Sequence, residues 1–456
     1  MPYRTILRLF NDSDELPFQI DNGVNPTNTD LSTAKTYFNF NKYLLSPDFH
    51  NSAGTQLSFL DGFNVSNNDV KLYIDSLKLS GDSLLVVNPN LSASQEALFN
   101  KYFTSISSAL TYVSDNSLTD VSILLFPGTY NESISIGDST VCIFGMGNKD
   151  DIIISNTLSS DIITTNYTNS NTYNLNITGV TFQTCKYAIT STNIKNINID
   201  NCVFKNCGWN STEPTNENQT GYENLQLSTH TSAGGCVSIT NATEIIIKNC
   251  EFSTSNKGIH LIDVLSGFIS NSLFEHNLDL SLHLNSSTGD GSTGCENIVV
   301  SGCKFDQNRS GSVKITGGIG NNIVECSINK SYGPAVFIEH TGDINVSGCT
   351  FYKNNLKSYI GTGAASNLGT FMIKGSTNIN SDSSYFLNAS GNSFSCGGQG
   401  TEATAYAIYA ADTGGREVNV SGSGFVCFPR TTGRVNDNSL VTDEALNYLS
   451  SLLHNS

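Results

Sequence analysis

The sequence predicts an all-β chain wound into a right-handed, single-stranded parallel β-helix, with a β-rich segment before it and capping helices at its ends. Three observations predict this fold class. A phenylalanine recurs about every 22 residues, a glycine or asparagine stands three residues before it, and aliphatic residues alternate before that. Periods of about 20 to 50 residues are the signature of stacked repeats. We therefore expect each repeat to form one coil whose strands pair with those of the next.

The phenylalanine position sets the register of the repeat. It advances by 22 residues from Phe182 to Phe204 and by 23 from Ile328 to Phe351. We interpret the 48-residue interval after Phe204 as a coil plus a loop, and the two 31-residue intervals as one coil with an inserted loop. The 43-residue interval after Phe351 has nearly the length of two coils. The position is held by Phe182, Phe204, Phe252, Phe274, Phe305, Ile328, Phe351, Phe394 and Phe425.

The position three residues before each phenylalanine predicts a bend between two strands. Glycine and asparagine adopt left-handed backbone geometry at the lowest cost, and such a bend needs that geometry. Glu325 is the exception and predicts a local distortion. The bend residues are Gly179, Asn201, Asn249, Asn271, Gly302, Glu325, Gly348, Gly391 and Gly422.

Positions two and four before the bend are expected to point into the core, because side chains alternate along a strand. Examples are Ile197 with Ile199 and Ile245 with Ile247, whereas the coil at Gly267 and Ile269 matches only half of the pattern. One residue after each bend, a second inward column contains Cys202, Cys250, Cys303, Cys326 and Cys349, with Ser272 interrupting it. We interpret these cysteines as small core residues, because a linear stack does not supply the tetrahedral ligands of a metal site.

Composition narrows the classes of partner. The chain has 456 residues, of which only 14% are charged, and a net charge of −17, which disfavours nucleic acid. No apolar run reaches the roughly 18 residues of a membrane span, and Met1–Phe10 lacks the apolar core of a secretory signal. We therefore expect no membrane insertion, and 12 cysteines that stay reduced in a cytosol.

The repeat divides the chain into three parts. Residues 1–90 are expected to form an N-terminal β-rich attachment segment, with strands within Tyr37–Leu45, Val70–Leu79 and Leu84–Val87. Residues 91–430 form the β-helix, which begins with a capping helix within Ser94–Ser114. Residues 431–456 form a tail in which Thr442–His454 is expected to be a short capping helix.

The start of the repeat resembles the pectin-lyase-like superfamily. The resemblance rests on Val121–Ile136, which contains a Pro-Gly-Thr-Tyr turn followed by an acidic residue, and on the Ile-Phe-Gly-Met-Gly stretch that ends at Gly147. In that superfamily, a helix that contains an alanine precedes these elements. The resemblance covers roughly residues 95–425 and implies the fold rather than any one activity.

The strand after each phenylalanine places its middle residue outward, as in Ile259-His260-Leu261. Stacking lines these residues up on one wall, where rings pack on sugars and long side chains bind hydroxyls. We predict that this wall binds a surface polysaccharide; the alternative is a wall covered by a packed loop or a neighbouring subunit. The predicted ligand-binding residues are His260, His283, Lys314, Phe337 and Tyr359.

A second outward stripe follows the phenylalanines directly, from Lys205 through Ser253 to Asn329 and Tyr352. It places Glu275 beside Asp306, and two carboxylates about 5 Å apart match a retaining glycosidase. Glu275 and Asp306 are therefore the catalytic candidates if the chain is an enzyme. Acids that meet by chance on a solvated stripe are the alternative.

The motifs of the superfamily's enzymes are missing. The sequence lacks the paired aspartates of polygalacturonases, the Asp-Phe-Ile-Phe-Gly stretch of pectin methylesterases and the calcium-and-arginine pattern of pectate lyases. An unrelated N-terminal segment, an acidic polar surface and degenerate catalytic motifs resemble virion fibres, spikes and capsid-associated proteins, which are often homotrimers. We therefore predict a virion protein assembled in host cytoplasm, with other virion or capsid proteins as partners and no cofactor or metal. The alternatives are a tailspike-type polysaccharide lyase or glycoside hydrolase, and a bacterial adhesin.

Overall fold

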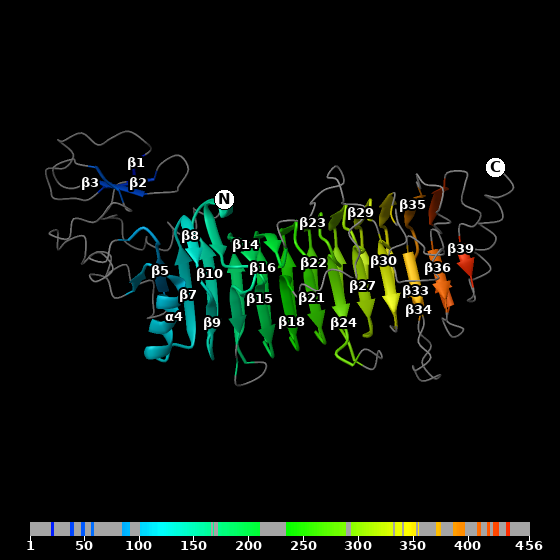
Figure 1. The fold of residues 1–456 in the computed structure, drawn as a ribbon, viewed down its shortest axis with the longest axis horizontal. Coiled ribbons are helices and arrows are strands. Elements are labelled where there is room, and N and C mark those ends of the chain that lie inside the picture. The colour runs from blue at the N-terminus through cyan, green and yellow to red at the C-terminus, as the bar shows by residue number, and fades with distance from the viewer. Residues whose placement is uncertain are drawn as a thin grey trace.

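The computed structural model confirms the predicted fold class: an elongated stack of coils built on three long parallel sheets (Figure 1). Each coil contributes one strand to each sheet, and each strand pairs with its equivalent in the next coil. The structure describes residues 20–21, 37–40, 47–50, 56–58, 84–91, 101–165, 167, 172–209, 234–288, 293–331, 333–339, 342–352, 354, 371–374, 386–396, 408–411, 417–419, 423–427 and 435–437.

The sheets are named by the order in which a coil enters them. In the described part of the chain, the first sheet contains β6 (Tyr102–Phe103), β5 (Leu84–Val87), β7 (Asp120–Leu125), β10 (Thr140–Gly145), β13 (Asn174–Thr178), β16 (Asn196–Asp200), β19 (Glu244–Lys248), β22 (Gly267–Ser270), β25 (Ile298–Ser301), β28 (Asn322–Val324), β31 (Ile344–Ser347), β34 (Phe386–Asn388) and β37 (Glu417–Asn419). The second sheet contains β8 (Gly128–Asn131), β11 (Ile152–Ser155), β14 (Thr181–Cys185), β17 (Val203–Cys207), β20 (Glu251–Ser253), β23 (Leu273–Glu275), β26 (Lys304–Asp306), β29 (Ser327–Asn329), β32 (Thr350–Tyr352), β35 (Ser393–Cys396) and β38 (Gly424–Cys427). The third sheet contains β9 (Ile134–Ile136), β12 (Ile163–Thr165), β15 (Tyr187–Thr192), β18 (Gly235–Thr240), β21 (Ile259–Ile262), β24 (Leu282–Asn285), β27 (Val313–Thr316), β30 (Val336–Glu339), β33 (Phe371–Lys374), β36 (Ile408–Ala411) and β39 (Val435–Asp437).

The predicted phenylalanine register is confirmed along the second sheet. Every residue of the column, from Phe182 to Phe425, pairs with the next one across adjacent strands. Consecutive rings from Phe182 to Phe305 stack with centroids 4.6 to 5.0 Å apart. The column also continues toward the N-terminus through Ile154 to Tyr130.

The prediction for one interval is wrong. Phe351 pairs directly with Phe394, so the 43 residues between them form one coil with inserted residues and not two coils. The 48-residue interval is also a single coil with an insertion, because Phe204 pairs with Phe252. Insertions at the turns leave the register of the strands unchanged, since loop closure costs little extra free energy as a loop grows.

The described bend residues adopt the predicted left-handed geometry, with φ of +72° at Gly179 and +55° at Asn249, while Gly422 lies outside the described residues. Glu325 does so as well, with φ of +55°, so it continues the pattern and the predicted distortion is absent. The half-matching coil has a steric reason. A Cβ on Gly267 would lie 2.3 Å from Cγ1 of Ile245, so the isoleucine of the preceding coil fills the space of the missing side chain.

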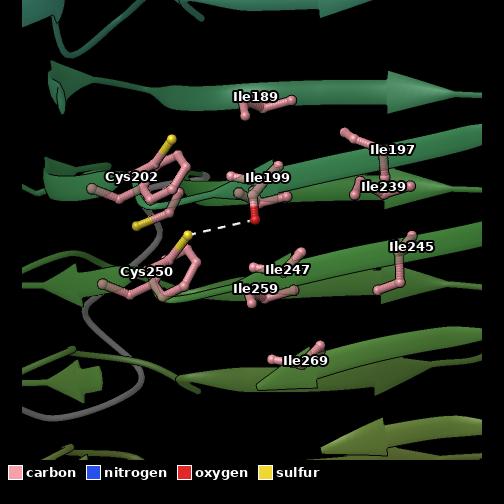
Figure 2. Close-up of a cluster of buried hydrophobic side chains, with 14 of the residues drawn as sticks. Ile189, Ile197, Ile199, Cys202, Ile239, Ile245, Ile247, Cys250, Ile259 and Ile269 are labelled. Atoms are coloured by element: carbon pink, nitrogen blue, oxygen red, sulfur yellow. Dashed lines mark hydrogen bonds between the residues drawn. The ribbon is translucent and has the colours of Figure 1, made fainter. Parts of the chain in front are cut away.

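The core consists of stacked aliphatic side chains with the cysteine column beside them (Figure 2). Cys202, Cys250, Cys303, Cys326 and Cys349 are each at most 3% exposed, and no disulfide forms among the described cysteines. Each thiol lies near a backbone carbonyl of the preceding coil, as in the 3.7 Å contact from Cys250 Sγ to the Ile199 oxygen. The prediction of small buried thiols is confirmed.

A polar ladder that the sequence reasoning missed lies three residues after the phenylalanines. The Nδ2 group of Asn308 donates to the Phe274 carbonyl at 2.9 Å, while its Oδ1 accepts from the backbone N–H of Asn277 at 3.1 Å. Asn354 bonds the Ile328 carbonyl in the same way. These buried amides satisfy backbone groups that the tight turn leaves without a partner. The spacing of three from the phenylalanine column is the signal that identifies them.

The N-terminal cap is the helix α4 (Ile106–Asp115), which starts twelve residues later than the predicted Ser94–Ser114. Residues 102 and 103 form strand β6 instead, and Ser105 caps the helix by accepting from the Ser108 N–H. The carboxylate of Glu132 completes the cap, because it accepts from the N–H groups of Ile106 at 2.9 Å and Ser107 at 2.8 Å. The acidic residue after the Pro-Gly-Thr-Tyr turn thus holds the helix on the first coil.

The boundaries of the repeat differ from those predicted. β5 already pairs with β7 in the first sheet, so the β-helix begins before residue 90, and β39 pairs with β36 beyond residue 430. A separate sheet is formed by β1 (Ile20–Asp21), β2 (Tyr37–Phe40), β3 (Pro47–His50) and β4 (Gln56–Ser58). Val70–Leu79 and the helix predicted at Thr442–His454 lie outside the described residues. Within the described residues, no helix has the length and hydrophobicity to cross a bilayer.

Candidate functional site

The outward face of the third sheet carries a continuous line of residues, which we call the third-sheet track. Its aromatic end pairs His260 with His283, His283 with Lys314, and Lys314 with Phe337, as the sequence predicts. The next residue in register is Met372 and not Tyr359, because inserted residues separate β32 from β33. Tyr359 itself lies outside the described residues.

The part of the track that precedes His260 in the chain carries hydroxyl groups. The sequence analysis did not predict this part. The residues in register below His260 are Ser238, Thr190, Thr164 and Ser135. Extending the same in–out–in pattern to the coils before residue 250 would have revealed them. The track therefore runs from a hydroxyl-lined segment to an aromatic segment along one wall of the stack.

The two histidines form a stacked pair, with ring centroids 5.0 Å apart and ring planes inclined by 13°. Asn285 Nδ2 donates to His260 Nε2 at 3.4 Å, and His283 Nε2 lies 3.4 Å from the Thr316 hydroxyl. Burial and the Lys257 charge lower the pKa of His260 from 6.5 to about 4. Burial, His260 and Lys314 lower the pKa of His283 to about 2. Both rings are therefore neutral at pH 7.

Lys314 and Phe337 continue the track as a cation–π pair. The Nζ atom of Lys314 lies 5.0 Å from the centroid of the Phe337 ring, and it also forms a 3.1 Å ion pair with Glu339. Lys257, at the edge of the same wall, is paired with Asp279 at 3.5 Å. Each of these two lysines therefore has a carboxylate partner within the wall.

Two kinds of evidence identify the fold: the unbroken parallel register of three sheets, and a family match. Residues 235–408 match the family model described as "Right handed beta helix region". The chain folds as a right-handed parallel β-helix. A search of curated proteins gives no match.

Solved β-helix structures resemble this one at low sequence identity. The A-module of mannuronan C-5 epimerase AlgE4 from Azotobacter vinelandii is 10% identical, with a TM-score of 0.40, over 78% of this chain and 99% of that one. A DFA-IIIase from Arthrobacter chlorophenolicus A6 is 12% identical, with a TM-score of 0.46, over 81% and 88%. Tailspike protein 3 of bacteriophage CBA120 is 10% identical, with a TM-score of 0.38, over 93% and 78%. These similarities concern the fold alone.

The second outward stripe of this β-helix also has the predicted register. Glu275 pairs with Asp306 on adjacent strands of the second sheet, and Asp306 pairs onward with Asn329. Asp306 also forms a 3.3 Å ion pair with Lys304, two residues earlier on the same strand. The two carboxylates are neighbours, and one of them is already neutralised by a lysine. Their proposed catalytic role stays a prediction.

The outward face of the first sheet has a different character. Ile246, Phe268 and Val299 stand in register on adjacent strands, with asparagines before and after them in the same column. The Phe268 side chain is 43% exposed, and Leu265 in the preceding turn is 52% exposed. Among the described residues, no group of three or more His, Cys, Asp or Glu side chains is arranged to hold a metal ion.

Proposed function

We propose that the chain is a structural β-helix of a virus particle that binds polysaccharide along the third-sheet track without cleaving it. The observation that carries the proposal is the continuity of the track, in which hydroxyl, imidazole, ammonium and phenyl groups follow one another at the spacing of adjacent strands. A linear polymer that lies along the stack would meet one such group at every coil.

The chemistry of the track suits sugars. An aromatic ring packs against the apolar face of a pyranose, while hydroxyl, amide and ammonium groups bond its hydroxyls. The side chains His260, His283, Lys314 and Phe337 are all partly exposed, so they are held in place by their neighbours and remain accessible. Rings and amides that are already positioned lose little conformational entropy when a ligand binds.

Glycan binding is tested with single variants of the aromatic end. We expect His283→Ala and Phe337→Ala each to weaken binding to the polysaccharide that the chain selects from an array. Phe268→Ala is the matched control, because it removes an exposed phenyl ring from the first sheet. Circular dichroism confirms that each variant is folded. Equal binding by all four proteins would show that the track is not the site.

The assignment to a virus particle rests on the overall organisation. A sheet of four short strands, β1–β4, precedes the β-helix in the chain, and the described cysteines are free thiols. Such thiols suit assembly in a reducing cytoplasm. Virion or capsid partners and homotrimeric assembly are part of this proposal. Mass spectrometry of purified particles tests it, and consistent absence of the chain from them would remove it.

The second candidate function is polysaccharide cleavage by Glu275 and Asp306, favoured by their pairing on adjacent strands. Strands about 4.8 Å apart bring two carboxylates near the separation of a retaining glycosidase. In such a mechanism Asp306, which is paired with Lys304, would be the nucleophile and Glu275 would be the acid. Release of reducing ends from a polysaccharide panel, abolished by Glu275→Gln with the fold intact, would establish this function in place of the first.

A further inference from the structure

We propose that the third-sheet track selects neutral polysaccharides and rejects polymers of uronic or sialic acids, an inference that rests on the proposed binding function. The reason is the arrangement of charge on the wall. Recognition of a sugar carboxylate needs a cation whose charge is not already compensated. The described part of the track places its cationic groups next to carboxylates or keeps them neutral.

Lys314 and Lys257 show this arrangement. Lys314 Nζ lies 3.1 Å from Glu339 Oε2, and the two side chains are only 23% and 16% exposed. Lys257 Nζ lies 3.5 Å from Asp279 Oδ2, with both side chains 27% exposed. An incoming carboxylate would have to displace Glu339 or Asp279, or accept their repulsion at close range.

The histidines do not supply the missing charge. Asn285 Nδ2 lies 3.4 Å from His260 Nε2, a contact in which the amide donates and the imidazole nitrogen accepts, as in a neutral ring. The stacking of His283 between His260 and the Lys314 ammonium disfavours a proton on either ring. The lowered pKa values of both imidazoles agree with this geometry.

The hydroxyl row of the track itself contains no charged side chain, and Lys186, directly before β15, places its Nζ 6.0 Å from the centroid of the Tyr187 ring. Thr190 stands in register between Thr164 and Ser238, and its hydroxyl lies 3.4 Å from Asp161 Oδ2. A carboxylate beside the hydroxyl row repels anions and accepts hydrogen bonds from sugar hydroxyls. The whole chain, with a net charge of −17, adds long-range repulsion of the same sign.

The test measures binding of the full chain to matched neutral and anionic polymers. Dextran, galactomannan and a mixed-linkage β-glucan serve as neutral probes, and polygalacturonate, alginate and polysialic acid as anionic probes. We expect binding to at least one neutral polymer, with an affinity that stays constant from about 0.05 to about 0.5 M salt, because screening acts only on charged contacts. Binding of the anionic polymers should be at least tenfold weaker.

A charge variant gives an independent readout. Glu339→Gln leaves the Lys314 ammonium without its carboxylate, and we expect anionic polymers to gain about two- to fivefold in affinity, in a salt-dependent manner. Asp200→Asn is the matched control: it releases Lys248 from a 3.6 Å ion pair on the first sheet and changes the net charge by the same amount. It should leave anionic binding as weak as before.

The outcomes separate the two proposals. Tighter binding of an anionic polymer than of any neutral one, lost in His283→Ala, would overturn the selectivity while the track remained the site. No binding of any polymer would overturn the proposed function, and the selectivity with it. An equal gain in Glu339→Gln and Asp200→Asn would show that net charge, not the local ion pair, controls the choice.

Discussion

Removing one ring of the phenylalanine column tests the register on which the description of both outward stripes depends. The Phe274 side chain is completely buried, and its ring stacks on Phe252 at 4.8 Å and on Phe305 at 4.6 Å. Phe274→Ala would open a cavity between two rings that the backbone holds one strand spacing away on either side. Such a cavity cannot close, because the adjacent coils are fixed by the sheet hydrogen bonds.

The magnitude follows from the full burial of the ring. Replacing a buried phenylalanine by alanine costs about 3 to 5 kcal/mol, and the upper half of this range is expected where the site cannot collapse. Phe268 provides the comparison within the same coil. It lies six residues earlier on the first sheet and is 43% exposed, so Phe268→Ala should cost less than about 1 kcal/mol.

Urea unfolding followed by circular dichroism measures both variants against the parent chain. Stacked coils need not unfold in two states, so the shift of the transition midpoint is the quantity to compare. Limited proteolysis would report whether the affected coil opens locally. Similar shifts for the two variants, or a larger shift for Phe268→Ala, would refute the inward placement of the phenylalanine column.

Three further predictions follow from the described contacts. Because the pKa values of His260 and His283 are lowered in the folded chain, the unfolded chain binds protons at a higher pH than the folded chain does. The free energy of unfolding is therefore at its full value above about pH 6.5, and it falls by about 3 kcal/mol per histidine between about pH 7 and about pH 4. Unfolding at the two pH values measures the loss, which His283→Gln should reduce; an unchanged pH dependence would contradict the assignment. Glu132→Gln should lower stability by about 1 to 2 kcal/mol, since it weakens the charged cap of α4, and a loss of helix signal at lower urea than the sheet signal would show it. Glu325→Gly should raise the free energy of unfolding by up to about 1 kcal/mol, because glycine adopts a φ of +55° without strain; a destabilised variant would show that the glutamate side chain matters more than the backbone.

The sequence predicts the strand register because core geometry leaves few alternatives at each inward position. The phenylalanine column and the bend residues repeat at fixed offsets from one another, and the structure places them together. Interval length is a weaker guide, because a turn can absorb inserted residues without moving the strands. This is why the coil between Phe351 and Phe394 was counted twice, and why Tyr359 was assigned to a track position that Met372 occupies.

The charge states of the wall could not be predicted from residue types. A histidine beside another histidine on a strand face is cationic or neutral depending on how deeply the two rings are covered. Only the structure shows His260 and His283 stacked and partly buried, and only the structure assigns Glu339 to Lys314 and Asp279 to Lys257. The asparagine ladder was missed for a related reason. A lone Asn in a chain rich in Asn carries no pattern until its offset from the core column is known.

The parallel stack itself accounts for the neutrality of the track. Equivalent residues of adjacent coils stand about 4.8 Å apart, where two like charges repel by about 1 kcal/mol in water and about 3.5 kcal/mol at the effective dielectric constant of a protein surface. Three consecutive cations at His260, His283 and Lys314 would therefore oppose the strand pairing that brings them together. Neutral imidazoles and a lysine with its own carboxylate remove this repulsion. The same requirement that stabilises the wall makes it a poor surface for anions and a suitable one for uncharged sugar rings.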